Sequence, residues 1–218
     1  MKKIIFSIVC LFVFAASTNA QSYKETFDTN SLGWTECGYQ NALGTALIDK
    51  GVMTVKSKGE LKGLGIAAAA LGGGGYQKVR ENTFFETHCY SPLDVEKPFE
   101  VTAKVNVKQL ASDRLVGFVF NYRDGGNFYA FSFNDDFVKF TRYVDNNVVG
   151  EVMQGIRTSG KRKSDMQWTL VSDGQELIFK VDGVAIMNIR YMPLSYNGFG
   201  FYTFGNQELV VDEIEFIQ

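Results

Sequence analysis

The chain has 218 residues, with 22 Lys and Arg against 24 Asp and Glu, which gives a net charge of −2 at pH 7. A slightly acidic chain lacks the basic surface that attracts nucleic acid, so we exclude a nucleic-acid partner. The densest basic run is GKRKSD at residues 160–165. We interpret it as a solvated turn, with a contact to an anionic glycan as the alternative.

The first 20 residues have the layout of a secretory signal peptide. Lys2 and Lys3 precede an apolar run from Ile4 to Ala16, and small and polar residues then lead to Ala20. The apolar run is much shorter than the roughly 20 residues that a membrane-spanning helix needs, and no later segment is continuously apolar over that length. We expect cleavage after Ala20, export to the periplasm or the cell exterior, and no membrane span.

Residues 21–218 are predicted to form one domain. Loss of the two N-terminal lysines would bring the net charge from −2 to −4. The length suits a single β-sandwich, and the sequence contains no Pro/Ser linker and no internal repeat. Lipid attachment at Cys10 is an alternative to cleavage, although Val9 stands where a small residue is expected.

Two cysteines, Cys37 and Cys89, remain after the signal peptide. An even pair in an oxidising compartment predicts a disulfide, which would close a loop of about 50 residues and stabilise the fold by up to ~4 kcal/mol. Two buried free thiols are the alternative, because the sequence does not show whether the two Cα atoms lie within bridging distance.

Short alternating or apolar runs recur along the chain, and no long segment has the period of a helix. They predict strands over residues 46–49, 52–56, 99–107, 115–122, 128–133, 137–144, 148–153, 168–171, 177–181, 184–189, 198–204 and 209–217. Four residue pairs predict tight hairpins, because each places glycine after a residue that tolerates positive φ: Lys50-Gly51, Asp173-Gly174, Asp182-Gly183 and Asn197-Gly198. The chain is therefore predicted to be antiparallel and all-β, in two packed sheets or a barrel.

Side chains alternate between the two faces of a strand, so the aromatic stretch from residue 118 to residue 143 can be divided into two sets. One set is mostly large rings, which we predict to be core: Phe118, Phe120, Tyr122, Tyr129, Phe131, Phe133 and Phe140. The opposite face is mixed and polar. We expect a ligand on these strands to meet that face, which carries Asn121, Phe128, Ser132, Lys139, Thr141 and Tyr143.

Four segments resemble the concanavalin A-like lectin/glucanase superfamily: ETFDTNSLGW (25–34), VGFVFNYRDGGNFYAFSF (116–133), WTLVSDGQELIFKVDGVAI (168–186) and VVDEIEF (210–216). The similarity covers nearly all of residues 21–218 and is greatest to laminin-G-like and keto-disaccharide-hydrolase-like jelly rolls, often found in exported bacterial proteins that handle glycans. The resemblance implies a two-sheet antiparallel β-sandwich. Its motifs are structural, and a fold does not fix a function.

The function that the resemblance implies is an exported, non-catalytic module that binds a polysaccharide, an oligosaccharide or a surface protein through the exposed face of one sheet. We predict Phe128 and Tyr143 as stacking rings. The expected polar contacts are Asn121, Lys139 and Thr141, with Arg123 and Asn127 at the rim. A purely structural envelope protein is a further alternative.

A glycan-active hydrolase or lyase with an atypical site is the enzymatic alternative. Glucanases of the superfamily carry a Glu-x-Asp-x-(x)-Glu strand, and the nearest match is EIEFIQ at residues 213–218, with glutamate at the aspartate position and Gln218 in place of the last glutamate. His88 and Tyr90 have the spacing of one strand face and the chemistry of a lyase base and acid. Two carboxylates within about 10 Å in one cleft would favour an enzyme.

Related jelly rolls often hold a structural calcium between their first and last strands. The resemblance implies that Glu25 or Asp28 could meet Asp212 there. Asp212 shares a strand face with Ile214 and Phe216, so its carboxylate is predicted to point toward the core. An Asp212 satisfied by backbone N–H groups is the alternative. We expect no other cofactor.

The glycine-rich run LGIAAAALGGGGYQ, at residues 64–77, is not followed by the Lys-Ser/Thr of a phosphate-binding loop. We interpret it as a flexible or closely packed loop.

Overall fold

The computed structural model describes residues 21–36, 44–58, 84–108, 110–156 and 164–218. They form strands connected by turns and loops, and no helix occurs among them. The strands are β1 (Ser22–Glu25), β2 (Gly44–Asp49), β3 (Val52–Ser57), β4 (Phe85–Tyr90), β5 (Phe99–Lys108), β6 (Leu115–Asp124), β7 (Asn127–Phe133), β8 (Phe137–Val144), β9 (Asn147–Gly155), β10 (Asp165–Ser172), β11 (Glu176–Val181), β12 (Val184–Arg190), β13 (Gly198–Phe204) and β14 (Glu208–Ile217).

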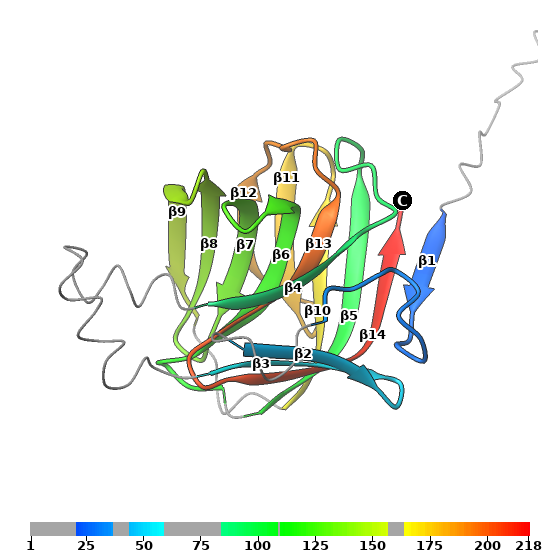
Figure 1. Cartoon of the computed structure of the whole chain (residues 1–218). Helices are drawn as coiled ribbons and strands as arrows, with labels where there is room; N and C mark the ends of the chain where they lie inside the picture. The colour runs from blue at the N-terminus through cyan, green and yellow to red at the C-terminus, as the bar shows by residue number, and fades with distance from the viewer. Residues whose placement is uncertain (1–20, 37–43, 59–83, 109, 157–163) are drawn as a thin grey trace, which may run out of the picture.

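These strands form two antiparallel sheets that stack as a sandwich (Figure 1). The eight-stranded sheet has the order β12-β11-β10-β5-β14-β3-β2, and β1 pairs with β14 as an additional strand. The six-stranded sheet has the order β4-β13-β6-β7-β8-β9. In Figure 1, β2 and β3 cross the bottom of the molecule, and β1 lies beside β14 near the C-terminus. The predicted two-sheet antiparallel sandwich is confirmed.

All the predicted strands are present, and β1 and β4 are two further strands that the local pattern did not predict. The hairpin at Lys50-Gly51 has the expected positive φ angles of 54° and 75°. The predicted hairpin at Asn197-Gly198 is wrong, because Gly198 begins β13 after a loop. The Asn197 side chain instead donates a hydrogen bond to the Ser91 carbonyl at 2.9 Å, which fixes that loop beside the chain that follows β4.

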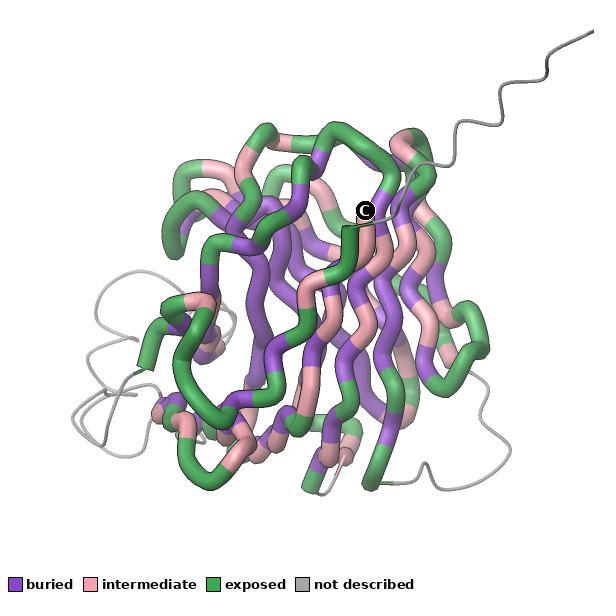
Figure 2. Tube along the Cα trace, turned by 90° about the vertical axis from the view of Figure 1, so that its right-hand side faces the viewer, coloured by how far each residue is buried: buried purple, intermediate pink, exposed green. Residues whose placement is uncertain are grey.

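The core is a set of aromatic rings that fill the space between the two sheets. Phe118 on β6 contacts Trp168 on β10 and Phe179 on β11 with ring centroids 5.5 and 5.8 Å apart. Phe120, Tyr129 and Phe131, which were predicted to be core, are buried as well, and Phe140 is partly buried against them. Figure 2 shows how buried and more exposed residues alternate along the strands, as the period of two requires.

A bulge in β6 moves two residues to the faces opposite those predicted. Gly198 of β13 pairs with Tyr122, and the next residue, Phe199, pairs with Phe120. Asn121 is therefore an extra residue in β6 with no pairing partner on β13. Asn121 adopts φ 48°, which asparagine tolerates better than most residues. The extra residue reverses the alternation, and Tyr122 therefore leaves the core and joins the outer side of the sheet.

The signal-peptide prediction concerns residues 1–20, which lie outside the described residues, as do the glycine-rich run at 64–77 and most of the basic run at 160–165. The described part of the chain contains no helix with the length and apolarity that crossing a bilayer requires.

We expect Phe118→Ala to lower the free energy of unfolding by about 3–5 kcal/mol, since it leaves a cavity among rings of both sheets. Guanidinium denaturation measures this. Val184→Ala is the control, because Val184 is 65% exposed on β12 and should change stability by less than about 0.5 kcal/mol. Similar losses in the two variants would contradict the assignment of Phe118 to the centre of the core.

Candidate functional site

The face predicted to meet a ligand is the side of the six-stranded sheet that points away from the sandwich, which we call the outer face. Phe128 pairs with Tyr143 and Ser132 pairs with Lys139 across β7 and β8, so these residues share one face as predicted. Thr141 pairs with Ala130 and lies on the same face. The structure therefore brings together most of the predicted set.

This face is covered by a second aromatic cluster. Its buried members are Val119, Tyr122, Phe128, Ala130, Tyr143 and Tyr202. Phe84, just before β4, lies across it with ring centroids 5.5 Å from Phe128, 5.8 Å from Tyr143 and 5.2 Å from Tyr202. Phe128 is consequently 0% exposed and Tyr143 is 8% exposed. The expectation that these two rings are exposed stacking platforms is wrong.

Asn121 was expected on the outer face, but the bulge turns it into the sandwich. Its side chain is fully buried, and its Oδ1 accepts a hydrogen bond from the Tyr191 hydroxyl at 3.1 Å. Tyr191 belongs to the main core. A ligand on the outer face therefore cannot contact Asn121.

Most of the other predicted polar residues are buried or form hydrogen bonds and ion pairs with other residues of the protein. Lys139 forms an ion pair with Glu151 at 2.7 Å, and Thr141 is buried. The Asn127 side chain donates to Asp124 Oδ1 at 2.9 Å and accepts from the Asp145 amide at 3.2 Å, so it holds two turns together. Arg123 pairs with Asp124 at 3.5 Å, yet its side chain stays 56% exposed.

An exposed ring, Tyr90, lies at one corner of this face. Gly198 pairs with Tyr90 on one side and with Tyr122 on the other, which brings the ends of β4, β13 and β6 together. Tyr90 is 65% exposed. Arg123 follows Tyr122 and lies over the ring of Tyr196, 5.5 Å from its centroid. We call Tyr90, His88, Tyr122, Arg123 and Tyr196 the corner site.

His88 is held within the corner site by contacts on its ring face and at both ring nitrogens. Its ring stacks on Tyr122 with centroids 4.0 Å apart, Nδ1 lies 3.2 Å from Glu86 Oε2, and Nε2 lies 3.3 Å from Thr35 Oγ1. The Tyr122 hydroxyl donates to Glu86 Oε1 at 3.0 Å. Burial, and then the nearby Glu86 carboxylate, raise the pKa of Tyr122. Both nitrogens of His88 thus have partners, which fix the orientation of the ring against Tyr122.

The carboxylates of the last strand are bound in the same way. Glu213 forms ion pairs with Lys24 at 2.6 Å and Lys104 at 3.3 Å, and the hydrogen bond from Lys24 lowers its pKa. Glu215 accepts a hydrogen bond from the Ser22 hydroxyl. β14 lies inside the eight-stranded sheet, not at its edge. A glycosidase acid needs a raised pKa, so Glu213 does not fit that role.

The residues proposed for calcium do not fit a common site. The Glu25 carboxylate accepts hydrogen bonds from the Phe27 and Leu32 amides, each at 3.2 Å, and from the Ser31 hydroxyl. Asp212 sits at a register shift between Val211 and Glu213 and is exposed, so the prediction that it points coreward is wrong. Asp28 accepts from Thr26 at 2.8 Å. Among the described residues, no group of three His, Cys, Asp or Glu could hold a metal ion.

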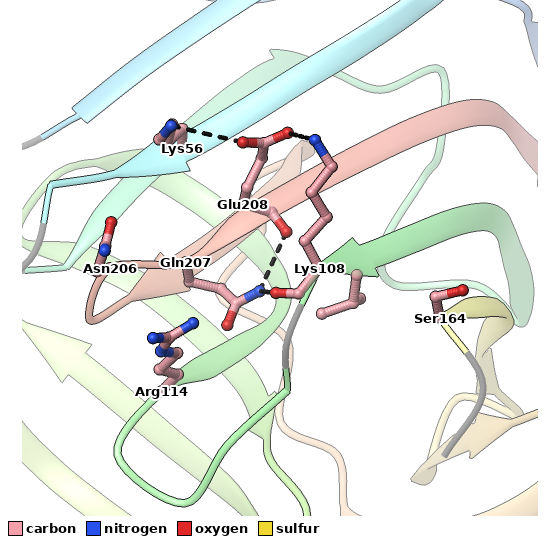
Figure 3. Close-up of a pocket in the computed structure, with 8 residues that line it drawn as sticks. Lys56, Lys108, Arg114, Ser164, Asn206, Gln207 and Glu208 are labelled. Carbon is pink, nitrogen blue, oxygen red and sulfur yellow. Dashed lines mark hydrogen bonds and ion pairs between the residues drawn. The ribbon is translucent and has the colours of Figure 1, made fainter. Parts of the chain in front are cut away.

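A pocket of about 440 Å³ opens on the eight-stranded sheet (Figure 3). Its lining includes Lys56, Lys108, Arg114, Gln207 and Glu208. Glu208 is the one carboxylate among the described residues of this lining, and its hydrogen bond with Lys108 lowers its pKa. Glycoside hydrolysis usually needs two carboxyl groups, and the described part of the lining offers one.

Comparison with solved structures places this architecture among known folds. A carbohydrate-binding module, CBM66 from Bacillus subtilis, has a TM-score of 0.50 at 16% identity, over 83% of this chain and 92% of that one. The β-glucanase of Bacillus licheniformis has a TM-score of 0.54 at 10% identity, over 89% and 97%. The endo-β-1,3-glucanase from Pyrococcus furiosus has a TM-score of 0.54 at 10% identity, over 90% and 93%. No protein-family model matches the sequence, and no curated protein sequence matches it.

The chain thus has the concanavalin A-like lectin/glucanase fold, as the sequence resemblance implied. At these identities the likeness concerns the fold alone, and both binding modules and glucanases share it.

Cys89 is a buried thiol on β4, and burial raises its pKa. Cys37 lies outside the described residues, so the disulfide stays a prediction. The amide of Thr35, two residues before Cys37, donates to the His88 carbonyl at 2.8 Å, so the chain leading to Cys37 passes beside the strand that carries Cys89.

Thiol labelling tests both states of Cys89. In the reduced, folded protein, Cys89 should react much more slowly than in the unfolded protein, because burial shields the thiol and disfavours the thiolate. If Cys37 and Cys89 are bonded, unfolded but unreduced protein lacking residues 1–20 should show no reactive thiol. Two reactive thiols in that sample would overturn the disulfide.

Proposed function

We propose that the protein is an exported, non-catalytic module that binds a polysaccharide or oligosaccharide at the corner site. The observation that carries this proposal is the exposure of Tyr90, 65%, at the end of an aromatic cluster that is otherwise buried. Export rests on the signal-peptide layout of residues 1–20.

The chemistry of the corner site suits a sugar ring. An exposed tyrosine offers an apolar ring face together with a hydroxyl, and a pyranose has both apolar C–H faces and hydroxyl groups. Arg123, the residue after Tyr122, has a half-exposed guanidinium that supplies N–H donors. Tyr90 and Arg123 are carried by strand ends that the sheet holds in place, so little ordering would be required on binding.

Binding without turnover is favoured by the state of the acidic and basic groups. Glu86 and His88 are within hydrogen-bond distance of each other. Glu86 also accepts a hydrogen bond from the Tyr122 hydroxyl, and His88 has Thr35 as its second partner. Glu213 and Glu208 each pair with two lysines. Neither arrangement resembles a pair of carboxyl groups whose pKa values are held apart for acid and base roles.

The neighbours in fold suggest which glycans to use as probes. Besides a carbohydrate-binding module, they include glucanases described as acting on β-1,3 and β-1,3(4) linkages. Affinity electrophoresis in gels that each contain one polysaccharide, a β-1,3-glucan or a mixed-linkage β-1,3(1,4)-glucan, measures retention directly.

We expect Tyr90→Ala to weaken binding of the retained glucan by about 1–3 kcal/mol, taking the stacking of bases on aromatic side chains as the analogue, and to leave the fold intact. Arg123→Gln should weaken it less. Val184→Ala is the matched control, because Val184 is also 65% exposed but lies on β12 of the other sheet.

A retained glucan whose affinity ignores Tyr90→Ala would remove the corner site. Failure of both glucans and of a wider glycan array to bind would remove the proposed function. Release of new reducing ends from the polysaccharide would replace it with the hydrolase alternative.

A further inference from the structure

The pocket on the eight-stranded sheet has a charge distribution that the corner site does not share. Lys56 on β3 and Lys108 on β5 stand on either side of Glu208 on β14 (Figure 3). Arg114, just before β6, lines the same pocket. Arg114 itself pairs with the neighbouring Asp113 at 3.9 Å. Among the described lining residues, Lys56 and Lys108 share the single carboxylate of Glu208, so the two lysine charges are only half balanced.

Gln207 gives the pocket an unsatisfied acceptor. Its residue is 0% exposed, and its Nε2 donates to the Lys108 carbonyl at 2.6 Å and to the Glu208 carbonyl at 3.0 Å. The opposite amide orientation would put Oε1 against those two carbonyl oxygens, so the orientation is fixed by the backbone of β5 and β14. In Figure 3, Oε1 lies on the far side of the amide from these bonds, toward Arg114.

Oε1 of Gln207 has no hydrogen-bond partner within the described part of the chain. A buried acceptor without a partner costs about 1–3 kcal/mol, and such groups in native proteins call for a physical explanation. An N–H or O–H donor from a molecule in the pocket would satisfy it.

Lys56 and Lys108 are held in place by Glu208, with Nζ of Lys56 3.5 Å from Oε2 and Nζ of Lys108 bonded to Oε1. Each ammonium has three donor hydrogens, so the bond to Glu208 leaves others for a second anion. The glutamate thus positions the two cations without neutralising the pocket.

We propose that this pocket binds an anionic sugar residue, with its carboxylate or sulfate contacting Lys56, Lys108 and Arg114 and one of its hydroxyls donating to Oε1 of Gln207. An inorganic anion pairs with the lysines but offers Gln207 little, whereas a neutral sugar brings the lysines no second anion. That the anion belongs to a sugar rests on the proposed function, but the anion-binding chemistry does not. A volume of about 440 Å³ is in the range of small-ligand sites.

Isothermal titration calorimetry of the purified protein tests this with trigalacturonate, a sulfated disaccharide, inorganic sulfate and a neutral glucose trisaccharide. We expect one or both acidic sugars to bind, and their relative affinities to tell carboxylate from sulfate. Lys108→Gln should weaken that binding about tenfold or more, because it removes a charge-assisted hydrogen bond.

Lys104→Gln is the matched control. Lys104 lies on the same strand and pairs with Glu213 of β14 as Lys108 pairs with Glu208, and the two lysine side chains are 59% and 62% exposed. Lys104→Gln should leave the affinity unchanged. Circular dichroism confirms that both variants are folded.

Equal affinities of wild type and Lys108→Gln, or equal losses in the two lysine variants, would overturn the pocket assignment. Inorganic sulfate that binds as tightly as the acidic sugars would remove the sugar from the proposal. If Tyr90→Ala abolishes acidic-sugar binding and Lys108→Gln does not, the corner site is the binding site and the pocket is not. Glucan retention without any acidic-sugar binding would end this proposal and leave the proposed function standing.

Discussion

The six-stranded sheet has to bury aromatic side chains on both of its faces. On the inner face, Phe118 and Phe131 meet Trp168 and Phe179 of the opposite sheet, which forms the sandwich. On the outer face, the described residues form no second sheet, and Phe84 packs across the rings instead. Burial of each ring contributes a few kcal/mol, so the rings buried on the inner face and those buried on the outer face both stabilise the fold. Tyr90, on the same face, is not buried in this way and is 65% exposed.

The bulge at Asn121 connects the two faces. One additional residue in β6 places Asn121 against Tyr191 in the core and sends Tyr122 to the outer face, where it stacks on His88. Asparagine tolerates the positive φ that the bulge requires, and Nδ2 of Asn121 has no partner among the described residues. Without this reversal, the outer face near β4 would lack the ring that fixes His88.

The outer side of the eight-stranded sheet is organised by two glutamates of β14. Each lies between lysines of its two neighbouring strands: Glu213 between Lys24 and Lys104, and Glu208 between Lys56 and Lys108. Cross-strand pairs of opposite charge stabilise such a surface only modestly. The second set adjoins a pocket that Arg114 and Gln207 also line. The same charge pattern therefore recurs on this surface in different surroundings.

The sequence by itself determined the fold class and most of the strands. Alternation of apolar side chains and the Lys-Gly and Asp-Gly turns are local signals, and the four core rings Phe118, Phe120, Tyr129 and Phe131 follow from them. The set of residues predicted to face a ligand lies only partly on one face of the sheet. Phe128, Lys139, Thr141 and Tyr143 do share one face, because the period of two in β7 and β8 is unbroken.

Only the tertiary structure decided which side chains are accessible. Phe84, which is far from both residues in the sequence, packs against the rings of Phe128 and Tyr143. The reversal at Asn121 depends on its pairing with β13, which no local pattern in β6 reveals. The pocket beside Gln207 joins β3, β5 and β14 with the segment before β6. Exposure and pocket shape depend on contacts between distant segments, and for that reason the sequence could name the face but not the residues left open on it.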